Sequence, residues 1–262
     1  MNNDCLRHFV HGISGVLMRF VLVHGGFHGA WCWNKLVPEL FQRGHEAIAI
    51  DLPGHGQRVD EESSLAAYRD AIVEVIEEGD VLVGHSMGGF AISVAADAVA
   101  DRLGHIMYLD AGLPLEGLPM RAAGAGNLSG RASAIEVIDD GRRMKFCSDE
   151  AATAFFYHDC SPELAQWACR MLTPQQLAPL VEPISIPHFW AANLPRSLIL
   201  CSQSRSGSGG GEASSKQTAV RLGVEPFWME ASHSPFLSQP GACAELMLEA
   251  IKRKPVGPLC PR

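Results

Sequence analysis

Short apolar runs that alternate with helix-length segments are the feature that most constrains the fold of this chain. Runs such as FVLV (20–23), VLV (81–83) and LILC (198–201) are continuously apolar, as is typical of strands buried on both faces. Segments with helical periodicity separate such runs, for example residues 64–79 and 90–104. A crossover helix between consecutive strands makes those strands parallel. The alternation therefore predicts an α/β fold with a doubly wound, mostly parallel sheet.

One long segment, residues 113–195, interrupts this alternation. It is rich in alanine, glycine, proline and aromatic residues, and it contains helical pieces such as SDEAATAFF and SPELAQWACRML. Because it separates two expected sheet strands, we interpret it as a helical cap that covers the sheet and lines a substrate pocket. The sequence thus predicts an α/β core of residues 18–112 and 196–262, a cap of residues 113–195, and an N-terminal extension of residues 1–17.

Charge and composition disfavour several classes of function. The net charge of −8 argues against nucleic acid or a membrane surface as a partner, since both reward basic patches. No apolar run reaches the roughly 18 residues that a transmembrane helix needs, and the N-terminal region lacks the features of a signal peptide. The eight cysteines form no CxxC pair and no zinc-finger spacing. We therefore expect reduced thiols in a cytoplasmic protein without a metal site.

The strongest local motif is Gly84-His85-Ser86-Met87-Gly88, which follows an expected strand and precedes an expected helix. A G-x-S-x-G sequence in this context is typical of a nucleophile elbow, a strained turn whose flanking positions must be small. The N-terminus of the following helix presents free N–H groups to developing negative charge. The motif predicts Ser86 as a nucleophile and the Met87 N–H as an oxyanion donor.

Two other loops supply candidates for the remaining chemistry. His24-Gly25-Gly26 follows the first expected strand, where a backbone N–H can act as the second oxyanion donor. Gly26 is the preferred donor and Phe27 is the alternative. His233 lies between the last expected strand and the last helix, from which an imidazole can reach the elbow. The order of serine before histidine also suits this architecture, so His233 is the predicted general base.

These motifs together resemble the alpha/beta-hydrolase superfamily, in particular the branch of plant hydroxynitrile lyases, plant methyl esterases and related bacterial esterases. The resemblance covers nearly the whole chain from Met18 onward. It rests on FVLVHGGFHGAWCWNKLVPEL, GHEAIAIDLPGHG, VLVGHSMGG, YLDAGLP, FFYHDCSPELAQWACRMLTPQQLAPL and SHSPFLSQP. In the lyases of this branch a threonine follows the first-strand histidine and a lysine follows the catalytic histidine, but this chain has Gly25 and Ser234. Without a cation to stabilise a leaving cyanide, the resemblance favours ester hydrolysis over cyanohydrin cleavage.

The catalytic acid departs from the pattern of this branch. The family's acid normally follows the strand that ends near Cys201, where this chain has Ser204. A serine hydroxyl can orient an imidazole, but it cannot stabilise the imidazolium with a full charge. Three explanations are open: Asp110 supplies the acid, Glu212 or another acid folds back from the glycine-rich loop, or the protein has only a Ser–His pair or has lost catalysis. We take Asp110 as the predicted acid, against the alternative that it is a structural carboxylate.

The favoured function is a serine-dependent carboxylic ester hydrolase that forms an acyl-enzyme. Its expected substrate is a small or medium apolar or aromatic ester, and no cofactor or metal is expected. The candidate substrate-binding residues are Phe27, His85, Tyr157 and Trp167. The alternatives are a carbon–carbon lyase of the hydroxynitrile type and a weakly active or non-catalytic ligand-binding homologue. A homodimer is left open.

Overall fold

Six apolar strands form one sheet in the computed structural model of this chain, which describes residues 16–123, 134–205 and 212–253. The strand order is β2-β1-β3-β4-β8-β9, and every pairing is parallel. Residues of the central strands are buried because helices cover both faces. This architecture confirms the predicted α/β fold. The strands are β1 (Arg19–Val23), β2 (Glu46–Ile50), β3 (Asp80–His85), β4 (Leu103–Leu109), β8 (Arg196–Cys201) and β9 (Phe227–Met229).

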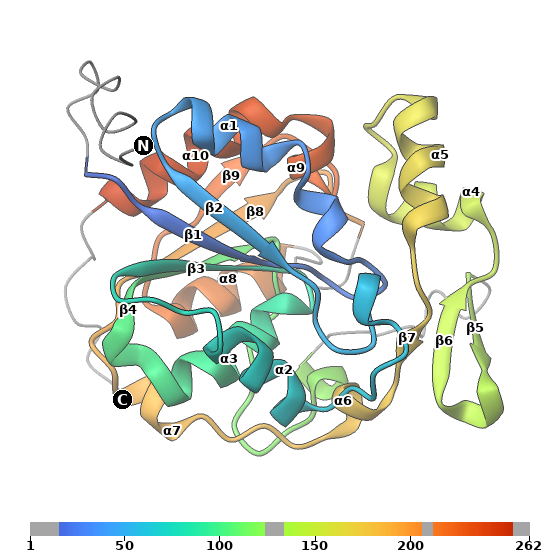
Figure 1. Cartoon of the computed structure of the whole chain (residues 1–262), viewed down its shortest axis with the longest axis horizontal. Coiled ribbons are helices and arrows are strands. Elements are labelled where there is room, and N and C mark those ends of the chain that lie inside the picture. The colour runs from blue at the N-terminus through green and yellow to red at the C-terminus, as the bar shows by residue number, and fades with distance from the viewer. Residues whose placement is uncertain (1–15, 124–133, 206–211, 254–262) are drawn as a thin grey trace, which may run out of the picture.

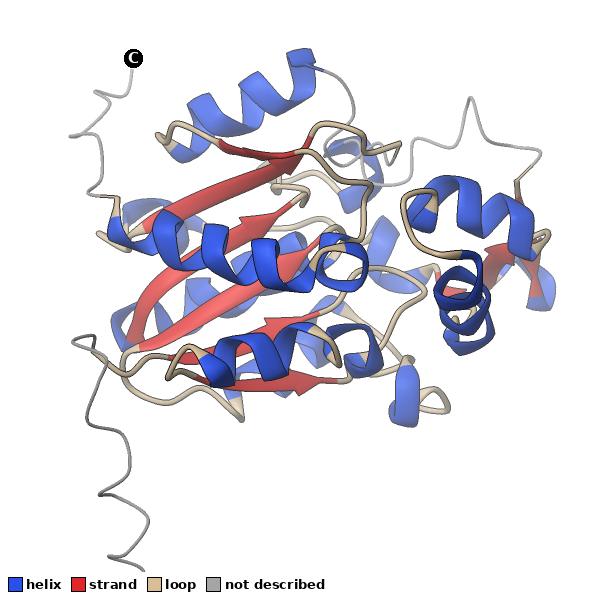
Figure 2. Ribbon diagram, turned by 90° about the horizontal axis from the view of Figure 1, so that it is seen from above, coloured by secondary structure: helices blue, strands red, loops and turns tan. Residues whose placement is uncertain are grey.

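The helices lie in two layers on either side of the sheet (Figures 1 and 2). On one face α1 (Leu36–Gln42) packs against α10 (Pro240–Lys252). On the other face α2 (Leu65–Val73) packs against α3 (Gly88–Val99), the helix that follows β3. The remaining helices of the core are α8 (Glu212–Leu222) and α9 (Pro235–Ser238). This arrangement leaves the carboxyl ends of the strands as the edge where loops of the core gather.

The described residues between β4 and β8 form an inserted segment, and much of it stands beside the edge where the strands end (Figure 1). Its helical parts are α4 (Asp149–Ala152), a π-helical turn (Thr153–Tyr157), α5 (Pro162–Met171), α6 (Ala178–Val181) and α7 (Pro187–Ala191). It also contains a three-stranded antiparallel sheet of β5 (Ile135–Ile138), β6 (Arg143–Phe146) and β7 (Gln175–Gln176). The expected helical cap did not include this sheet, because its strands are too short to show an apolar alternation.

The inserted segment shares one hydrophobic core with the sheet. Buried residues of the strands, such as Leu82 and Ile199, belong to the same cluster as Phe156 and Phe189 of the inserted segment. Apolar burial of this kind holds the inserted segment against the core. Its polar side chains therefore have defined positions relative to the loops at the strand ends.

Candidate active site

Five neighbouring strands end at one edge of the sheet and bring the predicted site residues together. Because all five are parallel, the loops after β1, β3, β4, β8 and β9 lie next to one another. The register pairs strand-end residues across the sheet: Val23 with Gly84, His85 with Leu109, Leu109 with Ile199, and Cys201 with Met229.

Ser86 occupies a strained turn between β3 and α3. Its φ is +53°, in the left-handed region that residues other than glycine seldom adopt. Side chains would not fit at the flanking glycines, since a Cβ at Gly84 would lie 2.7 Å from the Gly88 carbonyl oxygen and a Cβ at Gly88 would lie 2.6 Å from the His24 carbonyl oxygen. Ser86 is partly exposed, whereas every other residue of 80–93 is buried. The turn thus presents one hydroxyl at the N-terminus of α3, as in a nucleophile elbow.

The loop after β1 lies directly against this turn. A Cβ at Gly25 would lie 2.8 Å from the Cβ of Ser86, so the absence of a side chain allows the two loops to approach. The N–H of Phe27 donates to Oε1 of Gln175 at 3.4 Å. Gly26, in contrast, is partly exposed. These contacts favour the prediction that the N–H of Gly26, rather than that of Phe27, is the second oxyanion donor.

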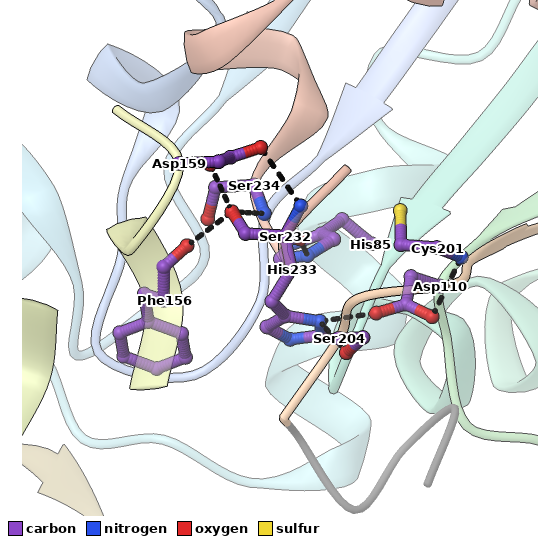
Figure 3. Close-up of polar contacts among 9 residues, drawn as sticks. All are labelled: His85, Asp110, Phe156, Asp159, Cys201, Ser204, Ser232, His233 and Ser234. Atoms are coloured by element: carbon purple, nitrogen blue, oxygen red, sulfur yellow. Dashed lines mark hydrogen bonds and ion pairs between the residues drawn. The ribbon is translucent and has the colours of Figure 1, made fainter. Parts of the chain in front are cut away.

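His233 and Asp110 form a buried pair at the same edge (Figure 3). Nδ1 of His233 lies 2.5 Å from Oδ2 of Asp110, and both side chains are fully buried. The other carboxylate oxygen, Oδ1, accepts the N–H of Cys201 at 3.3 Å. With Nδ1 donating its proton to Asp110, Nε2 is the ring nitrogen of His233 that can accept a proton. The pair thus has the arrangement of a general base that is oriented by an acid.

Ser204 also contacts the imidazole of His233. Its Oγ lies 3.3 Å from Nδ1, a longer distance than the 2.5 Å contact of Asp110 with the same atom. The serine at the expected acid position is therefore a neighbour of His233, while the carboxylate beside the same ring comes from the loop after β4 (Figure 3). Glu212, the third candidate, begins helix α8. The glycine-rich run at 206–211 lies outside the described residues.

Buried neutral histidines support these loops. Nε2 of His85 donates to the carbonyl oxygen of His233 at 2.8 Å, and the two ring centroids are 4.4 Å apart. Burial lowers the pKa of His85 well below its usual value, and the neighbouring His233 and His28 act in the same direction. Burial also lowers the pKa of His28 to about 3 and that of His24 to about 4. His85 therefore supports the loop of His233 as an uncharged ring.

Aromatic rings of the inserted segment surround His233. The ring of Phe156 stacks on the imidazole, with centroids 5.7 Å apart and an interplanar angle of 17°. Phe155 meets the same imidazole edge to face at 6.3 Å. Phe27, a candidate substrate-binding residue, is buried against Phe146, with centroids 5.0 Å apart. His233 therefore lies beside an apolar cluster to which both the core and the inserted segment contribute.

The other two aromatic candidates contact the core. Tyr157 is fully buried, and its hydroxyl lies 2.8 Å from Nε2 of His28. Nδ1 of His28 lies 2.8 Å from the carbonyl oxygen of Gly26, so Tyr157 is linked through one histidine to the loop after β1. Trp167 of α5 is partly buried and meets Trp31 edge to face at 5.3 Å.

A family model described as the alpha/beta hydrolase family matches residues 20–246. Apart from Arg19 of β1, the match includes all strands of the six-stranded sheet as well as Ser86, Asp110 and His233. The chain belongs to the alpha/beta hydrolase family. This agrees with the resemblance drawn from the sequence motifs.

Two plant proteins are among the sequence relatives of this hydrolase. Norfluorocurarine synthase 1 of Strychnos nux-vomica is 39% identical and methyl jasmonate esterase 1 of Vitis vinifera is 37% identical, each over 103 residues. Each match covers 36% of this hydrolase and 39% or 40% of the relative, so the chain spans about two fifths of the length of the curated relatives it matches. The crystal structure of polyneuridine aldehyde esterase has the same fold, with a TM-score of 0.77 and 24% identity over 89% of this hydrolase and 99% of that chain.

Sequence reasoning missed two polar residues that contact the loops of the site. Asp159 accepts the N–H of Ser232 at 2.8 Å, and Gln175 accepts the N–H of Phe27. Both lie in the stretch FFYHDCSPELAQWACRMLTPQQLAPL that carries part of the resemblance. The sequence signal for Asp159 was its place as a carboxylate directly after the aromatic run FFYH (155–158). Its partner is distant in the sequence, so no local pattern indicated the contact.

Clusters of metal ligands and membrane-spanning helices are both absent from the part of the chain that the structure describes. Within it, no group of three or more histidine, cysteine, aspartate or glutamate side chains is arranged to hold a metal ion. None of the helices in that part is long and apolar enough to cross a bilayer. Its cysteines are free thiols, and Cys32, Cys201 and Cys243 are buried.

Proposed function

We propose that this alpha/beta hydrolase is a serine-dependent carboxylic ester hydrolase in which Ser86 is the nucleophile, His233 the general base and Asp110 the acid. The single observation that carries the proposal is the buried 2.5 Å contact between His233 and Asp110 at the strand edge where the Ser86 turn lies. An imidazole oriented by a carboxylate beside a serine elbow is the arrangement that acyl transfer requires.

The reaction proceeds in two steps. His233 takes the proton of the Ser86 hydroxyl as the oxygen attacks the ester carbonyl, and the N–H groups of Gly26 and Met87 stabilise the oxyanion. The protonated His233 then gives its proton to the leaving alkoxide, which leaves an acyl group on Ser86. Water, activated by the same histidine, releases the carboxylic acid and restores the hydroxyl. Asp110 stabilises the imidazolium in both steps through its negative charge.

Asp110 is proposed as the acid in preference to Ser204 because of both distance and charge. The carboxylate oxygen lies 2.5 Å from Nδ1 of His233, whereas the serine oxygen lies 3.3 Å from the same atom. Only the carboxylate can offset the positive charge that develops on the imidazole. The N–H of Cys201 on the second carboxylate oxygen holds Asp110 in the required orientation.

The proposed substrate is a small or medium ester with an apolar or aromatic part. The support is the aromatic cluster beside the base, in which Phe156 stacks on His233 and Phe27 packs nearby. His85, Tyr157 and Trp167 were also predicted to bind substrate. His85 and Tyr157 are fully buried and contact the loops after β9 and β1, and Trp167 meets Trp31. The names of two relatives, a methyl jasmonate esterase and a polyneuridine aldehyde esterase, are consistent with ester substrates of this kind.

The two alternative functions are not favoured. Ser234 follows His233 where the lyases of this branch have a lysine, and several relatives are named as esterases. Binding without turnover would not need a buried acid–base pair. A cytoplasmic location and a homodimer remain predictions.

The test is hydrolysis of short p-nitrophenyl esters by the wild-type chain and by Ser86→Ala. We expect the variant to retain less than about 1% of the wild-type rate, because no other group in the site supplies the nucleophile. Ser197 provides a matched control, since its Oγ lies 2.8 Å from Nε2 of His105 in a second buried serine–histidine contact. Ser197→Ala should keep its activity. Wild-type rates in Ser86→Ala would refute the proposal.

A further inference from the structure

Asp159, in the inserted segment, contacts the loop that carries His233 (Figure 3). Its Oδ2 accepts the N–H of Ser232 at 2.8 Å and the hydroxyl of Ser238 at 2.9 Å. Its Oδ1 accepts the hydroxyl of Ser232. Besides the thiol of Cys160 at 3.9 Å, this carboxylate therefore binds three N–H or O–H donors, two of which belong to the residue directly before His233.

Ser232, which receives two of the contacts of Asp159, links the backbone on both sides of His233. Ser232, His233 and Ser234 are fully buried, so this stretch cannot obtain its hydrogen bonds from bulk water. The hydroxyl of Ser232 also lies 3.0 Å from the carbonyl oxygen of Phe156, and it accepts the N–H of Ser234 at 3.5 Å. Asp159 is thus the charged member of a network that encloses residues 232–234.

The same stretch of the inserted segment also fixes the imidazole ring. Phe156, three residues before Asp159, stacks on the ring of His233 with an interplanar angle of 17°. From the core side, the ring centroid of His85 lies 4.4 Å from that of His233, and Nε2 of His85 donates to the carbonyl oxygen of His233. The ring is therefore packed between the inserted segment and the core. The position of the base depends on both.

We propose that Asp159 is a positioning residue that fixes the loop of His233, so that the imidazole stays in register with Asp110 and Ser86. The inference rests on the proposed ester hydrolysis. Hydrogen bonds to a carboxylate are stronger than those between neutral groups, and proton transfer is sensitive to displacements of about 1 Å. Without the carboxylate, the buried N–H and hydroxyl of Ser232 lose their acceptor, and the loop must shift to find another. The base then spends less time in line with the serine.

The test compares Asp159→Ala with the wild-type chain on short p-nitrophenyl esters. We expect kcat to fall roughly 10- to 100-fold while KM stays within about threefold, because the substrate pocket is retained and only the base is displaced. Asp159→Asn keeps one oxygen acceptor for the N–H of Ser232, so its kcat should lie between those of the wild type and Asp159→Ala. A residue that only stabilised the fold would lower the concentration of active sites and leave kcat per active site unchanged.

Ser238→Ala is the matched control. It removes a hydroxyl hydrogen bond from the same carboxylate but keeps the N–H of residue 238, which donates to the Ser234 carbonyl oxygen at 3.3 Å, so kcat should remain near the wild-type value. The proposal is wrong if Asp159→Ala keeps wild-type kcat per active site, or if Ser238→Ala loses as much. If Asp159→Ala does not fold, a wild-type kcat in Asp159→Asn would likewise show that the proposal is wrong. Inactivity of the wild-type chain itself would instead refute the proposed ester hydrolysis.

Discussion

Asp110 and His233 are 123 positions apart in the chain, yet Oδ2 of the first lies 2.5 Å from Nδ1 of the second. Asp110 follows β4 and His233 lies beyond β9, while β8 separates these two strands in the sheet. The carboxylate therefore reaches across the end of β8, where its other oxygen accepts the N–H of Cys201. An acid that follows β4, the neighbour of β8 in the sheet, can thus meet the same imidazole nitrogen that Ser204 contacts from the loop after β8.

Ser204 should contribute little to the rate. Its Oγ lies 3.3 Å from Nδ1 of His233 and carries no charge, so Ser204→Ala should lower kcat by less than about tenfold. The double variant Asp110→Asn/Ser204→Asp should have a kcat at least about tenfold above that of Asp110→Asn, because Ser204→Asp returns a carboxylate to Nδ1 of His233. Steady-state kinetics of the single and double variants measure both effects. A loss in Ser204→Ala equal to that in Asp110→Asn would contradict this assignment.

Although the lyases of this branch have a threonine at this position, the packing of Gly25 against Ser86 in this chain should make a side chain there costly to activity. A Cβ at this position would lie 2.8 Å from the Cβ of Ser86, so Gly25→Thr should displace the nucleophile and lower kcat by roughly 100-fold. Gly26→Ala is the control, since its Cβ would meet the flexible end of Gln175 at 3.1 Å and would not approach Ser86. The kcat of the two variants on one ester gives the comparison. Equal kcat values would show that the close approach to Ser86 has no effect.

Acid should destabilise the fold through its buried histidines. Burial lowers the pKa of His24 and His105 to about 4 and that of His28 to about 3, while these side chains titrate near 6.5 in an unfolded chain. Between pH 6.5 and about 4 the unfolded state binds more protons, so the free energy of unfolding falls as the pH falls. Each histidine should contribute about 1.4 kcal/mol per pH unit in this window and nothing above it.

Urea unfolding at several pH values tests this expectation. His105 lies outside the candidate site, so His105→Asn isolates one histidine without changing the catalytic groups. The variant should show a smaller slope of unfolding free energy against pH below 6.5, by about one proton. An unchanged slope would mean that His105 is not held neutral by the fold.

Local patterns in the sequence predicted the parts of the protein that depend on neighbouring residues. The strand, sharp turn and helix around Ser86 form one continuous stretch, and the structure has this order with Ser86 at a positive φ. The alternation of apolar strands with helices likewise predicted the parallel sheet. Strands β5 and β6 were not predicted, since four residues each are too few to reveal a period.

Contacts between distant segments could not be read from the sequence. Three explanations for the acid stayed open because the choice depends on how far Asp110 can reach across β8, which only the register of the strands determines. No local pattern indicated the contact of Asp159 with Ser232, since the two residues are 73 positions apart. Both contacts arise from strand order and from the packing of the inserted segment.

The most direct test of this account is the kcat of Asp110→Asn for a short p-nitrophenyl ester, measured per active site and compared with the wild type. Asparagine keeps the shape of the buried side chain but cannot stabilise the imidazolium of His233 with a charge. The account predicts a fall in kcat of about 10³- to 10⁴-fold with a folded protein and a similar KM. A kcat within about tenfold of the wild-type value would mean that Asp110 is a structural carboxylate, and would contradict the account.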